Sequence, residues 1–92
     1  MDTDARVRVL YEASAPLLSE DAAKGVLHYL EHGEPEMALE GLVLELIAAN
    51  AAPAGIEFTV WEALARELHL DDEPIFDGEF WRKFTDWGRR AR

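Results

Sequence analysis

One stretch of the sequence has the residue types and the order of a zinc hydrolase. His28, Glu31 and His32 match the H-x-x-E-H order, in which two histidines bind zinc and the glutamate acts as general base. Such a site also needs a third ligand, supporting residues and a substrate cleft, for which short helices offer little room. We therefore expect both histidines to lie on the surface near a helix end, without a metal. A zinc hydrolase built on these residues is the least favoured of three functional hypotheses, and the other two are given at the end of this section.

No other pattern in the chain favours catalysis. The absence of cysteine excludes a disulfide, a thiolate metal site and a cysteine nucleophile. Ser14 precedes a turn and Ser19 caps a helix, and neither lies in the Asp-Ser-Leu setting of an acyl carrier protein. The acids at 71–73 and 77–79 lack the ligand spacing of an EF-hand calcium loop. We expect no enzymatic activity, no cofactor and no small-molecule substrate.

The charges of the chain are unevenly placed. Nineteen acids and nine bases give a formal charge of -10, and residues 9–81 hold sixteen of the acids but two of the bases. Residues 25–65 contain no lysine or arginine, whereas residues 82–92 contain five bases and one acid. A surface of this charge repels phosphate backbones and anionic lipids, and it either attracts a cationic partner or serves solubility. We therefore expect no direct binding to nucleic acid or to a membrane.

Length and composition are typical of one small folded domain. The chain has 92 residues, of which 49% are hydrophobic, so that one core is expected over residues 1–92. The first residues lack the basic and apolar regions of a signal peptide, and no apolar run approaches the roughly 18 residues of a membrane span. These features favour a cytoplasmic protein.

Apolar residues recur at helical spacing in the first half of the chain. The pattern predicts a helix over residues 3–14, before Pro16, and a second helix that Ser19 caps and Gly33 ends. Pro35 suits the first turn of a third helix, which is apolar around most of its circumference and is expected to be the buried centre. The apolar stripes are Val7, Leu10 and Tyr11; Ala23, Val26, Leu27 and Leu30; and Leu39, Leu42, Val43, Leu46 and Ile47.

A loop and a fourth helix are predicted next. Residues 50–55 have the composition of a loop, and Thr59 followed by Glu62 has the pattern of a capping box that begins a helix. The apolar residues before and within this helix are expected to pack onto the bundle. They are Ile56 and Phe58 before it, a core stripe of Val60, Leu64, Ala65 and Leu68, and Trp61 beside the stripe.

The acidic turn at 71–74 separates this helix from a final helix that is expected to include Phe76. Gly88 is expected to loosen the end of the final helix before a basic tail at 88–92. An isolated strand would have no partner for its backbone groups. The predicted fold is therefore all-α, a compact bundle of four to five short helices with a central apolar helix.

Large aromatic side chains gather near the C-terminus. They are Phe76, Phe80, Trp81, Phe84 and Trp87, and most are expected to close one end of the core because one short helix rarely exposes so many rings. Trp81 is the exception, because acids precede it. We predict that its ring is presented to a partner.

The middle of the chain carries a family resemblance. Leu27 to Leu46 reads LHYLEHGEPEMALEGLVLEL, and a later helix ends LARELHLD. Residues from about 17 to 72 resemble the MafI-type immunity proteins of bacterial polymorphic toxin systems, and the most specific part is Glu31-His32-Gly33-Glu34 followed by Ala38-Leu39-Glu40. The resemblance implies a small acidic helical protein that is made beside a toxin. It also implies stoichiometric binding to the C-terminal toxic domain, commonly a nuclease.

The residues that bind such a partner are predicted from charge and exposure. A nuclease presents a basic cleft, which an acidic bundle can cover while its charge speeds association. An alternative function is a nucleic-acid mimic or regulator that binds a cellular DNA-binding protein through the same acids. The predicted partner-binding residues are Glu31, Glu34 and Glu36 after the second helix, Asp71, Asp72, Glu73, Asp77 and Glu79 before the last, and Trp81.

Overall fold

The computed structural model describes residues 1–90, which form five α-helices and one 3-10 turn. The elements are α1 (Thr3–Ser14), η1 (Ala15–Leu17), α2 (Glu20–Glu31), α3 (Pro35–Ala49), α4 (Phe58–Glu67) and α5 (Phe80–Arg90). No strand is present among these residues, and the predicted all-α bundle is confirmed. No helix in the same range combines the length and the apolar character that a bilayer span requires.

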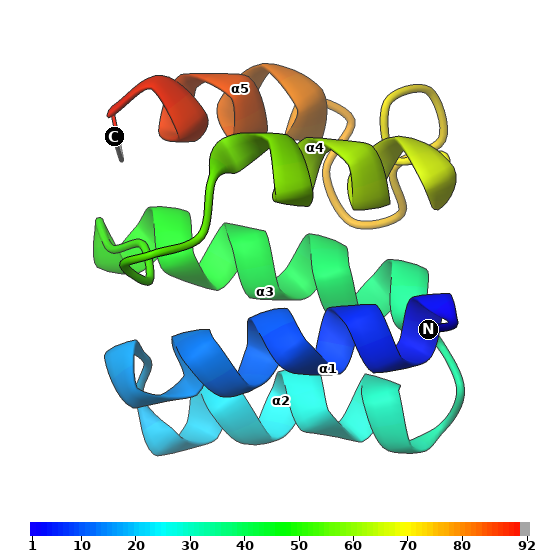
Figure 1. The fold of residues 1–92 in the computed structure, drawn as a ribbon, viewed down its shortest axis with the longest axis vertical. Coiled ribbons are helices and arrows are strands. Elements are labelled where there is room, and N and C mark those ends of the chain that lie inside the picture. The colour runs from blue at the N-terminus through cyan, green and yellow to red at the C-terminus, as the bar shows by residue number, and fades with distance from the viewer. Residues whose placement is uncertain (91–92) are drawn as a thin grey trace.

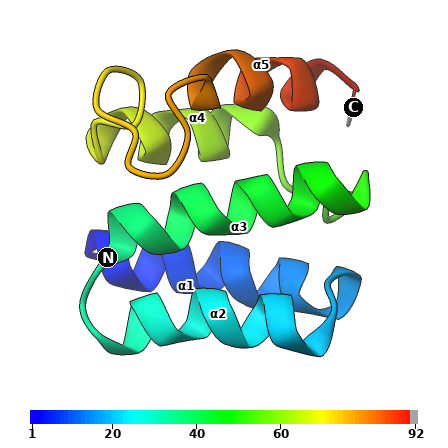
Figure 2. The same ribbon diagram turned by 180° about the vertical axis from the view of Figure 1, so that it is seen from behind.

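The helices are arranged around α3. Figures 1 and 2 show α3 running through the middle of the bundle, with α1 and α2 on one side of it and α4 and α5 on the other. Six residues of α3 are buried, namely Ala38, Leu39, Glu40, Leu42, Val43 and Leu46. The prediction that the third helix is the centre of the fold is therefore confirmed.

The first two helices have the predicted bounds, and the structure adds a cap at Asp2 to the predicted cap at Ser19. The side chain of Asp2 accepts a hydrogen bond from the backbone N–H of Ala5 at 2.8 Å, and that of Ser19 accepts one from Ala22 at 3.2 Å. Each bond satisfies a backbone donor that has no partner inside the helix. After α2, Gly33 takes the left-handed conformation with φ of 68°, which glycine adopts without a steric cost.

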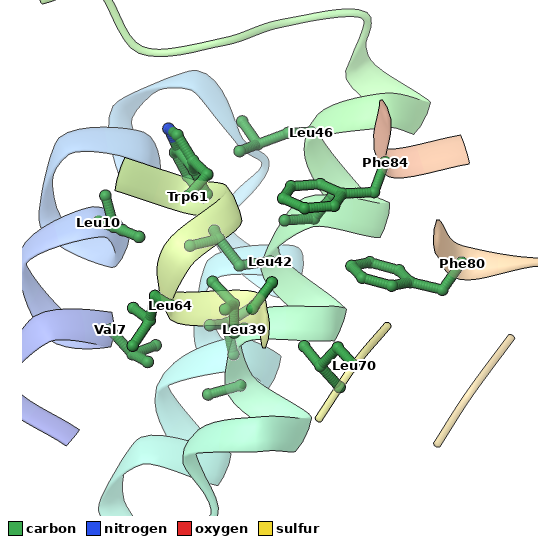
Figure 3. Packing of buried hydrophobic residues seen from close by; sticks show 14 of the residues in the cluster. Val7, Leu10, Leu39, Leu42, Leu46, Trp61, Leu64, Leu70, Phe80 and Phe84 are labelled. Atoms are coloured by element: carbon green, nitrogen blue, oxygen red, sulfur yellow. The ribbon is translucent and has the colours of Figure 1, made fainter. Parts of the chain in front are cut away.

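The hydrophobic core joins all five helices. Figure 3 shows side chains from α1, α3, α4 and α5 meeting around Leu42, and Val26 and Leu30 of α2 belong to the same cluster. The aromatic contribution is large, because Trp61, Phe80, Phe84 and Trp87 are all at most 4% exposed. The prediction that most of the C-terminal rings close the core is confirmed for Phe80, Phe84 and Trp87.

Two predictions for α4 are wrong. The helix begins at Phe58 with Glu57 at the N-cap position and no side-chain cap, so that Thr59 lies inside the first turn and forms no capping box. Trp61 is 2% exposed and Val60 is 51% exposed, the reverse of the predicted order. Trp61, Leu64 and Leu68 recur at helical spacing, and this register buries the larger apolar side chain at the cost of the smaller one.

The final helix also differs from the prediction. It begins at Phe80, so that Phe76 lies in the connection before it, and it continues through Gly88 to Arg90. Gly88 is buried, and an added Cβ atom there would lie 2.4 Å from the ring of Phe58. Gly88 therefore admits an aromatic ring rather than loosening the helix. The last two residues of the predicted basic tail, Ala91 and Arg92, lie outside the described residues.

Candidate protein-binding surface

The two acidic corners predicted from the sequence lie at the same end of the bundle. Both views show the α2–α3 corner and the α4–α5 connection, residues 68–79, at one end, where α1, α3 and α5 also begin (Figures 1 and 2). The rings of Tyr29 in α2 and Phe76 in the connection have their centroids 5.6 Å apart, which confirms that the two segments meet. We call this region the acidic end. Its predicted partner-binding carboxylates are Glu31, Glu34, Glu36, Asp71, Asp72, Glu73, Asp77 and Glu79.

The direction of the helices explains part of this charge. The N-terminus of a helix carries a partial positive charge that favours nearby carboxylates. Glu36 lies in the first turn of α3, and Asp77 and Glu79 immediately precede α5. Acids placed at separate helix starts therefore come together, because these helices start at the same end of the bundle.

The α2–α3 corner carries charge that no neighbouring base neutralises. Glu31 is exposed, whereas Glu34 and Glu36 are partly buried. Within residues 1–90, none of the three carboxylates forms an ion pair. This corner therefore presents its negative charge directly to solvent.

The α4–α5 connection carries both paired and unpaired acids. Arg66 lies 3.5 Å from Asp71, Lys83 lies 2.6 Å from Asp77, and Arg82 lies 3.6 Å from Glu79. Asp72 and Glu73 are exposed, and neither forms an ion pair in the described part of the chain. Of the acids in this connection, Asp72 and Glu73 are thus the ones whose charge is most available to a partner.

Asp77 is the carboxylate with a clear shift in acidity. Its Oδ2 atom pairs with Lys83, and its Oδ1 atom accepts a hydrogen bond from the backbone N–H of Glu79 at 2.9 Å. The hydrogen bond from Lys83 is the main reason that the pKa of Asp77 lies below its ordinary value of 3.8, and the backbone bond adds to the effect. These contacts bind Asp77 to the start of α5, so that its charge serves the fold.

Trp81 is less available than the sequence suggests. It is partly buried, and its ring packs edge-on against Phe84 with centroids 5.2 Å apart. The guanidinium group of Arg66 lies 4.9 Å from the centroid of the Trp81 ring, which is the geometry of a cation–π contact. Phe76 is instead the exposed ring of this region, at 46%.

Glu40 is a functional candidate that the charge pattern does not single out. It lies in α3 and is fully buried, and its carboxylate accepts hydrogen bonds from the backbone N–H groups of Ile75 at 2.6 Å, Phe76 at 2.9 Å and Asp77 at 2.9 Å. A buried carboxylate needs such partners because it has lost its hydration. The signal in the sequence is an acid among the apolar residues of the central helix, which indicates a buried charge with a partner elsewhere in the chain.

The two histidines of the H-x-x-E-H order lie on the surface near the end of α2, as the sequence predicts. His28 and His32 are exposed with ring centroids 4.2 Å apart, and the Nδ1 atom of His32 lies 2.7 Å from the carbonyl oxygen of His28. Among residues 1–90, the ligand atoms that do converge belong to His69, Asp72 and Glu73, within 4.8 Å of one another. All three of these residues are exposed.

A groove lies at the opposite end of the bundle. It has a volume of about 520 Å³ and is formed by the α3–α4 loop, the start of α4 and the end of α5. Its apolar lining includes Pro53, Ile56, Phe58, Trp61 and Trp87. The indole N–H of Trp87 donates a hydrogen bond to the carbonyl oxygen of Ala51 at 2.8 Å, so the wall formed by α5 is tied to the loop. None of the predicted partner-binding residues lines this groove.

Comparison with protein-family models, with curated proteins and with solved structures finds no match for this chain. The resemblance to MafI-type immunity proteins therefore stays a prediction from the residues that carry it.

Proposed function

We propose that this protein is an immunity protein, which binds and neutralises the toxic C-terminal domain of a cognate bacterial polymorphic toxin. The toxic domain is expected to be a nuclease with a basic cleft. The proposal is supported by the resemblance of Leu27 to Leu46 to MafI-type immunity proteins. It is supported independently by the gathering of both acidic corners at one end of the bundle.

The position of the unpaired carboxylates is the observation that carries the proposal. Glu31, Glu34, Glu36, Asp72 and Glu73 lie at the acidic end without an ion pair in the described residues. A concentrated negative field attracts a basic protein before contact and raises the rate of association. An antidote needs this rate, because damage to nucleic acid begins as soon as the toxin is free.

Inhibition in this proposal is stoichiometric and involves no turnover. The protein acts by covering a basic surface, and the contacts are those of a protein interface. A nucleic-acid mimic that binds a cellular DNA-binding protein would use the same charge, so the identity of the partner is what separates the two functions.

The test is co-expression with the toxic domain encoded beside this gene. We expect the chain to restore growth of a bacterial host that expresses the toxic domain, to abolish its nuclease activity in vitro, and to form a one-to-one complex with it. A neighbouring domain that is neither bound nor neutralised would overturn the proposal. Specific binding to a cellular DNA-binding protein, without protection from the toxin, would establish the alternative.

A further inference from the structure

Two apolar side chains stand exposed within the acidic end. Ile75 is 42% exposed and Phe76 is 46% exposed, and they are consecutive residues of the α4–α5 connection. Single exposed apolar residues are ordinary on a protein surface. An adjacent pair between the acids of 71–73 and those of 77–79 differs, because it combines an apolar anchor with a charged rim.

The backbone that carries this pair is held from inside the fold. The buried carboxylate of Glu40 accepts hydrogen bonds from the backbone N–H groups of Ile75 and Phe76, and from that of Asp77 after them. Hydrogen bonds to a charged acceptor are stronger than those between neutral groups. These hydrogen bonds therefore fix the backbone of the α4–α5 connection at the two residues whose apolar side chains are exposed to solvent.

The ring of Phe76 is partly exposed and packs against two helices. It lies against Tyr29 of α2, and its Cε2 atom is 3.9 Å from the position that a Cβ atom would occupy at Gly41 in α3. A side chain positioned before binding loses little conformational entropy when a partner covers it. Phe76 is therefore both exposed and positioned, as an interface anchor must be. Trp81 is less exposed than Phe76, because Arg66 lies over its ring.

We infer that Ile75 and Phe76, held in place by Glu40, form the anchor through which the acidic end docks on its partner. The complementary surface is an apolar pocket on a protein, with lysine or arginine side chains around its rim. Charge complementarity selects this occupant, since Asp72 and Glu73 beside the anchor are exposed and form no ion pair in residues 1–90. The inference rests on the proposed function for the identity of the partner.

The test measures dissociation of the complex with the neighbouring toxic domain. We expect Phe76→Ala to speed dissociation by about 30-fold and Ile75→Ala by about fivefold, because a central anchor acts mainly on release. Val60→Ala is the matched control, as Val60 is 51% exposed on α4, and it should change the rate by less than about twofold. Phe76→Leu keeps most of the apolar volume, so the complex with this variant should dissociate much more slowly than the complex with Phe76→Ala.

Glu40→Gln tests the positioning role. The substitution keeps the shape of the side chain and replaces one acceptor oxygen by a donor, so the hold on residues 75–77 weakens. We expect dissociation to be about tenfold faster, with the salt dependence of association unchanged because Glu40 is buried and adds little to the field of the surface. Circular dichroism and the urea midpoint establish that each variant is folded at the temperature of the assay.

The outcomes separate this inference from the proposed function. If the chain neutralises the toxic domain but Phe76→Ala and Ile75→Ala release it as slowly as the parent, the anchor is elsewhere and the inference fails alone. Loss of binding on Thr59→Arg, which blocks the groove between α4 and α5, would place the interface at the opposite end. If the parent chain binds no neighbouring toxic domain, the proposed function and the inference fall together.

Discussion

Asp77 illustrates how one acid of a charged surface can serve the fold. Its backbone N–H donates to the buried carboxylate of Glu40, its carbonyl oxygen accepts from the N–H of Phe80, and its side chain pairs with Lys83. These contacts join α3, the α4–α5 connection and the start of α5. The charge pattern of the sequence predicts that Asp77 binds a partner. Its contacts show that Asp77 stabilises the connection that carries Phe76.

The lowered pKa of Asp77 predicts an effect on stability in acid. The folded state holds the carboxyl group ionised below the ordinary value of 3.8, so the stabilisation is present above pH 3.8 and is lost as the pH falls through the folded pKa. Asp77→Asn should lower the free energy of unfolding near neutral pH and remove this part of its decline in acid. Urea unfolding followed by circular dichroism from about pH 7 to about pH 2 measures both effects.

Asp72→Asn is the control for this experiment, because Asp72 is exposed and forms no ion pair in the described residues. It should retain the decline of the parent protein below pH 3.8. Equal acid profiles for the two asparagine variants would show that Lys83 does not stabilise the ionised form of Asp77.

At the scale of elements, the packing of α4 against α5 depends on Gly88. The ring of Phe58 lies over Gly88, with its centroid 4.8 Å from that of Phe84 and edge-on to Trp87. A Cβ atom at residue 88 would meet three atoms of the Phe58 ring within 2.8 Å. Moving the Phe58 ring away from residue 88 would disturb its packing against Phe84 and Trp87.

Gly88→Ala should therefore destabilise the protein although alanine favours helices. The gain in helix propensity is at most about 1 kcal/mol, whereas forcing an extra carbon into a packed core costs about 1–3 kcal/mol. We expect a net loss of about 1 kcal/mol in the free energy of unfolding, measured by urea titration. Gly25→Ala in α2 is the matched control, because nothing lies within 4 Å of a Cβ atom there, and it should stabilise by about 0.5–1 kcal/mol. Stabilisation by both substitutions would show that Phe58 yields readily.

At the scale of the whole molecule, negative charge is concentrated at one end because several helices begin there. Acids that are far apart in the chain share one end because α2 ends where α3 begins, and α4 ends where α5 begins, on the same side of the bundle (Figures 1 and 2). The bases at 66, 82 and 83 neutralise Asp71, Glu79 and Asp77. The field available for steering therefore comes from the remaining carboxylates.

Reversing two of these charges should slow binding to the toxic domain. Asp72→Lys with Glu73→Lys is expected to slow association by about tenfold at low salt and to flatten its salt dependence, with a smaller effect on dissociation. Glu12→Lys with Glu45→Lys makes the same change in net charge on exposed positions nearer the other end of α1 and α3, and should have a weaker effect. Stopped-flow measurements at several salt concentrations distinguish the two pairs. Equal rates for both double variants would mean that net charge alone governs association.

Local signals in the sequence were sufficient for the first half of the fold. Ser19, Gly33 and Pro35 act within a few residues of themselves, through caps and dihedral preferences, and the apolar period of residues 35–49 predicts a buried helix without knowledge of its neighbours. The polarised charge is likewise a property of the sequence alone. These features depend on interactions that are short in sequence.

The tertiary structure decided which side chains the surface exposes. Thr59 and Glu62 have the spacing of a capping box, but the helix starts at Phe58 without a side-chain cap, and packing buries Trp61 rather than Val60. In the sequence, Phe76 and Trp81 are both aromatic residues beside acids. In the structure, Arg66, which lies ten or more positions earlier in the chain, covers the ring of Trp81.

The role of Glu40 depends on contacts between residues that are far apart in the chain. Its carboxylate meets backbone groups 35–37 positions later in the chain, and no local preference encodes such a pairing. The sequence by itself determined that the protein is an acidic helical bundle, because periodicity, caps and charge are read from neighbours. Packing decided which carboxylates remain available to a partner and which stabilise the fold. It also placed both acidic corners at one end of the bundle, because burial and electrostatic pairing depend on distance in space.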